Sequence, residues 1–328
     1  MALVIPRLDK YDKLIDEEVV TFGEFEQRIN QFQQKLRAEG FCQGDRFVLM
    51  FPVSVDFYAL VLALFASGMV AVLVDPGMGK KQILRAITET GAKALVTVRA
   101  VARLRWLVPR LWRLRIFVAE NFRWSGSIAA PPRQTSGLSD TEPTIVALNR
   151  NDHALITFTS GTGGTPKGVD RTHGFLRAQH EALAAQFPHT LEDVDCTCFP
   201  AMALHGLCCG TTTVIPAVNM RAPASVDPGP VIKQLIRHGV TRLSGAPAFI
   251  SAIARHINER AVQLKGVQKL AVGGATVPDS VCREVVRAFP GAEANVVYGS
   301  TEAEPMTSIT MEEILAEDNE SEGYLVGR

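Results

Sequence analysis

Short apolar runs alternate with longer amphipathic segments along this chain, and the alternation restricts the folds open to it. In the first half, strands are predicted at residues 45–51, 69–74 and 94–98, with helices at 54–66 and 80–90 between them. Strands separated by helices of ten or more residues form parallel sheets with right-handed crossovers. The alternation continues in the second half, with predicted strands at residues 211–215, 241–244, 269–272 and 294–297. The sequence therefore predicts an α/β fold of stacked βαβ subdomains with mostly parallel sheets.

Length and composition limit the class of protein further. The chain has 328 residues, and 47% of them are apolar, which is enough for a sizeable core. We expect approximate subdomains at residues 1–150 and 151–328. Lys and Arg together number 34, as do Asp and Glu, so no overall electrostatic field favours nucleic acid as a partner.

The cysteines and the N-terminus indicate the compartment. None of the six cysteines forms a Cys-x2-Cys pair, and an α/β protein of this size needs no disulfide framework. Residues 1–16 mix charged and apolar side chains and do not resemble a secretory signal. The longest apolar run, residues 57–74, is broken at Ser67 and Gly68, which favours a buried helix and strand over a membrane span. We expect a cytoplasmic protein with reduced thiols.

A buried strand at residues 154–158 leads into a loop rich in Gly and Thr. The loop reads Thr159-Ser160-Gly161-Thr162-Gly163-Gly164-Thr165-Pro166-Lys167-Gly168. Glycines let backbone N–H groups converge on an anion, and the hydroxyls and the Lys167 ammonium add further donors. Gly168 stands where a G-x-x-x-x-G-K-[ST] loop has Ser or Thr, so this is a different kind of phosphate loop. We predict a polyphosphate-binding loop, with a flexible surface turn as the alternative.

A second cluster of candidate residues follows the predicted strand at 294–297. Its sequence is Tyr298-Gly299-Ser300-Thr301-Glu302. An aromatic ring at a strand end offers a face on which a base can stack. Thr301 can hydrogen-bond a phosphoryl oxygen, and Glu302 can hold a hard divalent cation such as Mg²⁺. The alternative is a tight turn before an acidic surface helix.

Other candidates follow the remaining strands. His205 precedes a predicted apolar helix, near the carboxyl end of the sheet, where open α/β folds bind ligands; alternatively it is a helix-start histidine without chemistry. Small residues at Gly245-Ala246 and Gly274-Ala275 would let a planar ligand or acyl chain lie against backbone. A metal site from His205 and the cysteines at 196, 198, 208 and 209 is not favoured, because no zinc spacing fits.

The segment from Arg99 to Arg115 contains six arginines, Trp106 and Trp112, and no acidic residue. One interpretation is a basic amphipathic surface that contacts a membrane or an acidic partner enzyme. We favour a solvated helix whose apolar stripe packs on the sheet, because Pro109 shortens any face that could lie on a membrane.

The two motifs resemble those of the adenylate-forming superfamily, which includes acyl-CoA synthetases. The loop is similar to Thr-Ser-Gly-[Ser/Thr]-[Ser/Thr]-Gly-x-Pro-Lys-Gly, with Gly163 replacing a hydroxyl residue. Residues 298–302 are similar to the Tyr-Gly-x-Thr-Glu motif, in the expected order. The resemblance implies the N-terminal part of the large domain of such an enzyme, with ATP and Mg²⁺ as cofactors.

The resemblance also implies a role for each matched residue. The loop from Thr159 to Lys167 would wrap the β- and γ-phosphates, and Thr159 and Glu302 would hold Mg²⁺. The adenine site would comprise Gly274, Ala275, Val297, Tyr298, Gly299 and Ser300. Thr301 would contact the α-phosphate, while His205, Gly245, Ala246 and Gly274 would border the acid substrate. The residues taking part in catalysis would be Lys167, His205, Thr301 and Glu302.

A closer similarity is to the β-lactone synthetase branch of olefin biosynthesis. It is carried by residues 75–79, 212–216, 226–228, 245–248 and 300–305. It implies that a 2-alkyl-3-hydroxy fatty acid is adenylated and then closes to a β-lactone. His205 departs from this branch, where we expect a bulky apolar residue. A fatty acyl-CoA or acyl-carrier ligase, and a non-catalytic nucleotide-binding fragment, remain the alternatives.

Residues 323–328 resemble the beginning of the next subdomain of these enzymes, and no lysine-bearing C-terminal domain follows. We therefore expect the 328 residues alone to turn over poorly.

Overall fold

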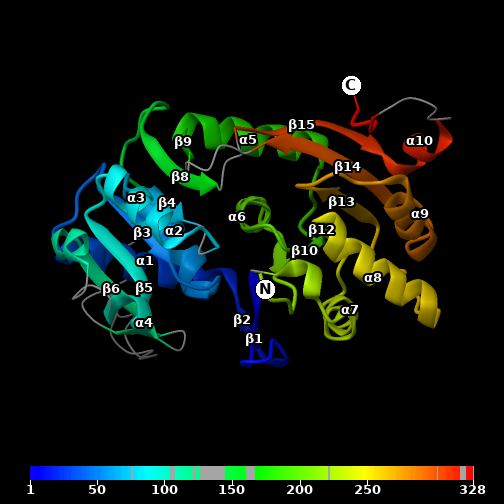
Figure 1. The fold of residues 1–328 in the computed structure, drawn as a ribbon, viewed down its shortest axis with the longest axis horizontal. Helices are drawn as coiled ribbons and strands as arrows, with labels where there is room; N and C mark the ends of the chain where they lie inside the picture. Colours follow the sequence, from blue (N-terminus) through cyan, green and yellow to red (C-terminus); the bar gives the residue numbers. More distant parts are fainter. Residues whose placement is uncertain are drawn as a thin grey trace. The chain divides into compact units, whose positions relative to one another are not determined.

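Two β-sheets organise the chain, and each belongs to its own compact unit. The computed structural model describes residues 1–74, 77–103, 108–120, 123–125, 145–159, 167–220, 222–300, 302–317 and 323–327. One unit comprises residues 22–178, and the other comprises residues 1–21 together with 179–328. The approximate division expected from sequence was at residue 150. The α/β fold with mostly parallel sheets is confirmed (Figure 1).

The sheet of residues 22–178 has the order β7-β6-β5-β3-β4-β8-β9. Its parallel strands are β3 (Arg46–Met50), β4 (Val70–Val74), β5 (Ala94–Val98), β6 (Arg115–Glu120) and β8 (His153–Thr159). The edge strands β7 (Arg123–Ser125) and β9 (Lys167–Thr172) run antiparallel to their neighbours. The strands predicted at 45–51, 69–74 and 94–98 are thus confirmed.

The helices of this unit begin and end where local signals predict. They are α1 (Phe22–Ala38), α2 (Val55–Ala66), α3 (Lys80–Glu89) and the short α4 (Arg99–Arg103). Ser54 caps α2, because its Oγ accepts a hydrogen bond from the Phe57 N–H at 3.1 Å. Arg28 of α1 donates to Asp56 of α2 at 2.9 Å, which fixes these two helices to each other.

The basic segment does not form one helix. It consists of α4, the 3-10 helix η2 (Pro109–Arg113) and the start of β6, and its residues 104–107 lie outside the described part. Pro109 begins η2, as the fixed proline φ allows at a first helical position. Leu111 and Leu114 are buried in the core of the unit, whereas Trp112 is exposed. Part of the predicted apolar stripe therefore does pack inward.

The sheet of the other unit has the order β15-β14-β13-β12-β10-β11-β1-β2. Its parallel strands are β1 (Leu3–Leu8), β10 (Val194–Thr197), β11 (Thr212–Val214), β12 (Arg242–Gly245), β13 (Lys269–Gly273) and β14 (Glu293–Ser300). The edge strands β2 (Leu14–Val20) and β15 (Ala303–Thr310) pair antiparallel with β1 and β14. The first twenty residues thus form a hairpin at one edge, which the sequence analysis did not predict.

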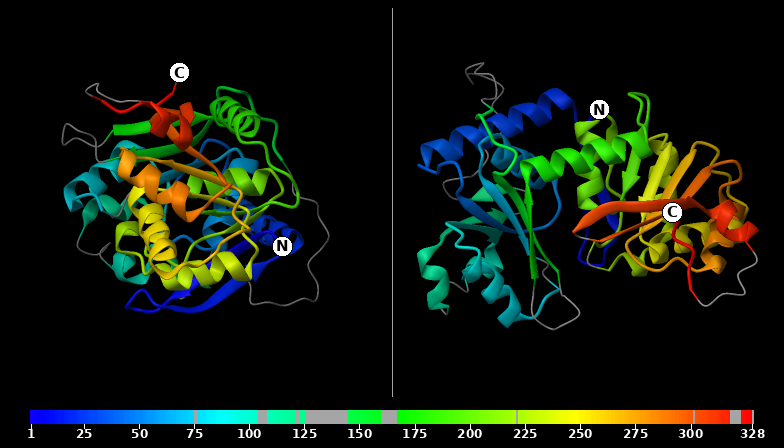
Figure 2. Two further views of the ribbon diagram at one scale, coloured as in Figure 1. Left: turned by 90° about the vertical axis from the view of Figure 1, so that its right-hand side faces the viewer. Right: turned by 90° about the horizontal axis from the view of Figure 1, so that it is seen from above.

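Helices cover this second sheet. They are the end of α5 (His173–Gln186), α6 (Pro200–Cys208), the 3-10 helix η3 (Pro223–Ser225), α7 (Pro228–Arg237), α8 (Pro247–Arg260), α9 (Asp279–Ala288) and α10 (Met311–Ala316). Figures 1 and 2 show α7, α8 and α9 next to one another along the sheet. Cys196 of β10 packs into the hydrophobic core with these helices. Side chains alternate along a strand, so Asp195 and Thr197 point to the opposite face, where α6 packs against β10 and β11.

Within the described residues, no helix is long and apolar enough to cross a membrane.

Candidate functional site

The carboxyl ends of four neighbouring parallel strands meet at one edge of the second sheet. Thr197 of β10 is in register with Ser244 of β12, Gly245 with Val272 of β13, and Gly273 with Val297 of β14. Strands that run in the same direction and in this register end side by side. Gly245 at the end of β12, Gly274 just after β13 and Tyr298 near the end of β14 are therefore neighbours at this edge.

Backbone is closely packed where β13 ends. A Cβ atom on Gly273 would lie 2.5 Å from the Val297 carbonyl oxygen, so only glycine fits beside β14. Gly274 has a φ of +78°, in the left-handed region that favours glycine, and a Cβ there would be 3.5 Å from the Phe199 ring. Tyr298, at the end of the neighbouring strand, is 49% exposed. This edge thus combines a smooth backbone surface with an accessible aromatic ring, which suits a planar ligand.

The turn after Tyr298 carries the candidate magnesium ligand. Ser300 of β14 pairs with Ala303 of β15, so the two strands form a hairpin, and Glu302 lies exposed in its turn. Thr301 lies outside the described residues. The backbone turns between β14 and β15, as the alternative interpretation predicted. The antiparallel strand β15 then lies between this turn and the acidic helix α10. An exposed carboxylate on a turn fits the hard oxygen ligand that Mg²⁺ requires.

The phosphate loop connects the two strands of another hairpin. Thr159 of β8 and Lys167 of β9 form the strand pair next to the loop. Residues 160–166, which include the candidates Ser160, Gly161, Thr162, Gly163, Gly164 and Thr165, lie outside the described part. The structure therefore brings together the backbones of Thr159 and Lys167 in the unit of residues 22–178. The other described candidates belong to the second unit.

His205 lies inside α6, not before it. The helix begins at Pro200, which occupies a first-turn position, so His205 falls in the last turn. His205 is only 5% exposed. Burial, followed by the nearby His189, His180 and Arg242, lowers the pKa of His205 to about 3, so the imidazole is neutral at physiological pH. A neutral imidazole can accept or donate a hydrogen bond but does not attract a carboxylate by charge.

A layer of buried polar residues lies on the same face of the sheet as His205. Asp195 and Thr197 on β10, Thr211 and Thr213 beside α6, and Ser244 on β12 are all buried. Ser244 Oγ donates to Thr197 Oγ1 at 2.7 Å. Beside this layer, the His189 and His205 rings meet edge to face with centroids 5.1 Å apart.

Two ionisable groups of this layer have pKa values shifted towards their neutral forms. His189 Nε2 lies 4.0 Å from Asp195 Oδ2. Burial is the main cause that lowers the pKa of His189 to about 4, with Arg242 acting in the same direction. Burial raises the pKa of Asp195 to about 7, against the opposing effect of Arg242. Both shifts favour the neutral forms, so this contact is not an ion pair.

The sequence analysis missed His180, His189 and Asp195 as members of this cluster. The spacing of His205 and Cys209, four residues apart, was an available signal, because it places both side chains on one helix face. The pairing with His180 of α5 depends on tertiary structure and has no local signal.

The sequence profile of the AMP-binding enzymes matches residues 9–328, nearly the whole chain. The chain belongs to the AMP-binding enzyme family. The family inferred from the phosphate loop and the Tyr298–Glu302 motif is thus confirmed.

Among AMP-binding relatives, this chain is similar to two enzymes named olefin beta-lactone synthetase. It is 31% identical to that of Stenotrophomonas maltophilia over 309 residues, covering 93% of this chain and 54% of the relative. It is 32% identical to that of Xanthomonas campestris, covering 88% of this chain and 52% of the relative. The medium-chain fatty-acid–CoA ligase of Escherichia coli is 25% identical over 88% of this chain and 52% of its own length. The chain spans about half the length of these relatives.

Solved structures of AMP-binding proteins share the fold. The N-terminal domain of FACL13 from Mycobacterium tuberculosis, determined with an inhibitor, has a TM-score of 0.77 and 20% identity, over 96% of this chain and 75% of that chain. The o-succinylbenzoate coenzyme A synthetase of Bacillus subtilis, determined with AMP, has a TM-score of 0.75 and 19% identity, over 95% of this chain and 58% of that chain. Similarity at this level of identity supports the fold.

Proposed function

We propose that this chain provides the nucleotide-binding part of an enzyme that joins AMP to a fatty carboxylic acid. The observation that carries the proposal is the common edge of β12, β13 and β14, where Gly245, Gly274 and Tyr298 are neighbours. Membership of the AMP-binding family supports ATP as the nucleotide.

In the proposed reaction, a carboxylate oxygen of the acid attacks the α-phosphorus of ATP. The bond from this phosphorus to the pyrophosphate oxygen breaks, and acyl-AMP and pyrophosphate form. Tyr298 stacks on the adenine, the Lys167 ammonium neutralises the outer phosphates, and Thr301 donates a hydrogen bond to the α-phosphate. Catalysis then rests on positioning and on stabilising the charge of the leaving group. Thr159 and Glu302 would hold Mg²⁺, which would supply further neutralisation of that charge.

For the acid, we propose a 2-alkyl-3-hydroxy fatty acid. Its 3-hydroxyl attacks the acyl carbon of acyl-AMP, loses its proton, and expels AMP as the four-membered lactone closes. The similarity to two olefin beta-lactone synthetases at 31% and 32% identity supports this choice. The backbone of Gly245 and Ala246 at the end of β12 would border the acyl chain, and His205 would orient the carboxylate.

Transfer of the acyl group to coenzyme A is the second candidate, and the similarity to the Escherichia coli ligase supports it. Mass spectrometry of the products from a 3-hydroxy acid, with and without coenzyme A, distinguishes the two. A lactone that forms without coenzyme A supports the first candidate, and a thioester that requires coenzyme A supports the second. We also propose a cytoplasmic location for the enzyme.

Nucleotide binding can be tested on the 328-residue chain itself. Calorimetric titration with ATP and Mg²⁺ should show binding that Tyr298→Ala weakens by about tenfold, since base–aromatic stacking contributes about 1–3 kcal/mol. Tyr11→Ala is the matched control, because Tyr11 is also exposed but lies near the hairpin turn of β1 and β2. Equal binding by the wild-type chain and Tyr298→Ala would refute the proposed adenine site. ATP binding without acid-dependent pyrophosphate exchange in the full protein would favour a non-catalytic nucleotide-binding role.

A further inference from the structure

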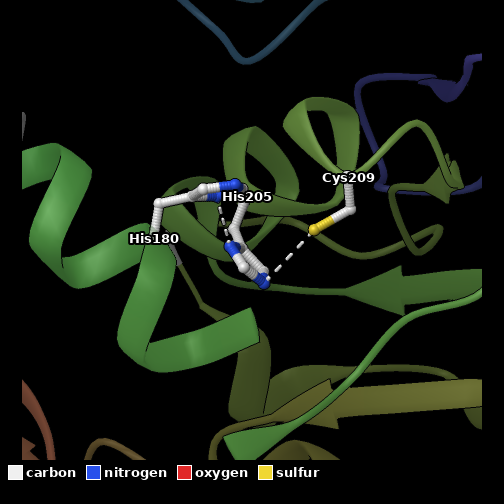
Figure 3. Close-up of side chains that lie close together, drawn as sticks. All are labelled: His180, His205 and Cys209. Atoms are coloured by element: carbon white, nitrogen blue, oxygen red, sulfur yellow. Dashed lines mark hydrogen bonds between the residues drawn. The ribbon is translucent and has the colours of Figure 1, made fainter. Parts of the chain in front are cut away.

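Three side chains of the kind that bind transition metals converge at α6. One ligand atom from each of His180, His205 and Cys209 lies within 4.8 Å of the other two. Figure 3 shows His205 between His180, which comes from α5, and Cys209, at the C-terminal end of α6. His205 Nδ1 is 2.9 Å from His180 Nδ1, and His205 Nε2 is 3.6 Å from Cys209 Sγ.

Local structure explains why two of these side chains meet. His205 is in the last turn of α6 and Cys209 is its C-cap residue, four positions later, so both project from the same face. The Cys209 N–H donates to the His205 carbonyl at 2.9 Å, which continues the helical geometry through the cap. The spacing is therefore fixed by backbone, and only His180 has to be supplied by another element.

The surroundings contain polar groups that lack partners. His189 packs its ring against that of His205, and its side chain is only 4% exposed. Neither nitrogen of His189 has a hydrogen-bond partner among the described residues, nor does Thr213 Oγ1 on β11. Buried polar atoms of this kind are usually satisfied by an ion or by ordered water.

We propose that His180, His205 and Cys209 bind a zinc ion. Imidazole nitrogen and thiolate sulfur are the ligands that this borderline-soft cation prefers. Binding forms one bond from zinc to Sγ and one to a nitrogen of each histidine, and the thiol proton of Cys209 leaves to solvent. Three protein ligands leave the fourth position for water or an external ligand, as in zinc sites that are not purely structural.

The three side chains are close enough for a tetrahedral site once the His205 ring turns so that one of its nitrogens faces both His180 and Cys209. Zinc bonds of about 2.0–2.1 Å to nitrogen and about 2.3 Å to sulfur place ligand atoms roughly 3.3–3.7 Å apart. The contact of 2.9 Å between His180 Nδ1 and His205 Nδ1 is shorter than this range, and the contact of 3.6 Å between His205 Nε2 and Cys209 Sγ lies within it. His205 would use one ring nitrogen for the metal, and the contact that its other nitrogen now makes with His180 or Cys209 would be replaced by the bond of that residue to zinc.

The charged groups around the proposed zinc site also allow a cation to bind there. Arg242 is a positive group whose charge acts on His205, His189 and Cys209. Its guanidinium donates to the Pro188 and Phe187 carbonyls and lies 3.7 Å from Asp193, which offsets its charge. The Cys209 thiolate adds a negative charge beside the metal itself.

The inference can be tested by metal binding to the purified 328-residue chain, without any assay of ATP chemistry. After treatment with a chelator and addition of zinc, the chain should retain one equivalent through gel filtration. Cobalt(II) in place of zinc should give the visible bands of a tetrahedral site and a near-ultraviolet thiolate-to-cobalt band. Cys209→Ser should abolish the thiolate band, and His180→Ala should weaken zinc binding by at least about tenfold, in line with the loss of a ligand.

Two controls match these variants. Cys208→Ser removes the adjacent, exposed thiol, and His256→Ala removes a histidine of α8, so both should keep the wild-type spectrum and affinity. The inference is overturned if cobalt gives no thiolate band with the wild-type chain. It is also overturned if Cys209→Ser and His180→Ala, shown to be folded by circular dichroism, bind zinc as the wild type does. Because the readout is metal content, neither result depends on the proposed adenylation.

Discussion

His238 Nε2 lies 3.0 Å from Glu17 Oε2, so the end of α7 is joined to the N-terminal hairpin through this pair. The same carboxylate accepts hydrogen bonds from Gln234 Nε2 at 2.7 Å and Arg237 Nη1 at 2.8 Å. The Glu17 side chain is only 7% exposed. Three donors thus compensate a nearly buried charge, and they hold β2 at the sheet edge.

This network makes the free energy of unfolding depend on pH. Burial alone would raise the pKa of Glu17, but the hydrogen bonds from Gln234, His238 and Arg237 outweigh it and lower the pKa below 4.5. The stabilisation is therefore fully present above pH 4.5 and is lost as pH falls through the lower folded value. Glu17→Gln should reduce the free energy of unfolding at neutral pH by about 1–3 kcal/mol.

Urea denaturation at several pH values measures the free energy of unfolding of the wild type and of Glu17→Gln. The difference between them should shrink as the pH falls below 4.5, because protonated glutamic acid and glutamine then carry the same charge. Glu259→Gln, at an exposed position of α8, should change little at any pH. A difference for Glu17→Gln that does not vary with pH would contradict the charged role of this carboxylate.

A close approach at the end of β12 leads to a second prediction. A Cβ on Gly245 would be 2.6 Å from Phe249 Cδ1 and 3.0 Å from Cys198 Sγ, both in the core. Gly245→Ala should therefore lower the free energy of unfolding by about 1–3 kcal/mol through overpacking. Gly23→Ala in α1 is the contrast, because a Cβ there meets nothing within 4 Å. It should be neutral or stabilise by about 0.5–1 kcal/mol. If thermal unfolding showed the same change in stability for Gly245→Ala and Gly23→Ala, the packing argument would be contradicted.

The helices and central strands could be predicted because their signals are local. Ser54 caps α2, Gly91 has a positive φ just after α3, and the apolar runs of β5 and β13 end at the expected residues. The hairpin of β1 and β2 could not be predicted in this way. Leu3 pairs with Thr213, so the stability of β1 comes from a distant strand rather than from its own sequence.

The candidate site was predictable to the same extent. Gly273 and Gly274 lie at the end of β13, which the alternation pattern locates, and the sheet register makes them neighbours of β14. Tyr298 was expected to follow a strand that ends at residue 297, but β14 continues to Ser300 and includes it. The sequence analysis singled out His205 and named Cys209 with it only in a metal site that it did not favour, and it did not name His180. His180 and Cys209 come together only when α5 and α6 have taken their places, and the polar residues of β10 look unremarkable in sequence.

A third prediction separates the roles of the two motifs in binding nucleotide. Lys167 is proposed to contact the outer phosphates, which ATP has and AMP lacks. Lys167→Ala should therefore weaken ATP binding to the 328-residue chain by tenfold or more, equivalent to about 1.4 kcal/mol, and leave AMP binding unchanged. Competition titration with both nucleotides measures this, with Lys265→Ala on an exposed loop as control. Equal weakening of AMP binding would place Lys167 elsewhere or show a general structural effect.

Asp195 gives a pH dependence of the opposite sign to that of Glu17. Burial raises its pKa from 3.8 to about 7, so the folded state holds a proton that the unfolded chain releases. The stabilisation that this proton gives is complete below pH 3.8 and is lost as pH rises through about 7. Asp195→Asn, which has nearly the same shape and no charge, should therefore be more stable than the wild type at about pH 8, by up to about 4 kcal/mol. Urea denaturation should show this advantage growing between about pH 4 and 7 and then levelling off. If Asp195→Asn were instead less stable at every pH, Asp195 would be ionised in the fold and paired with Arg242.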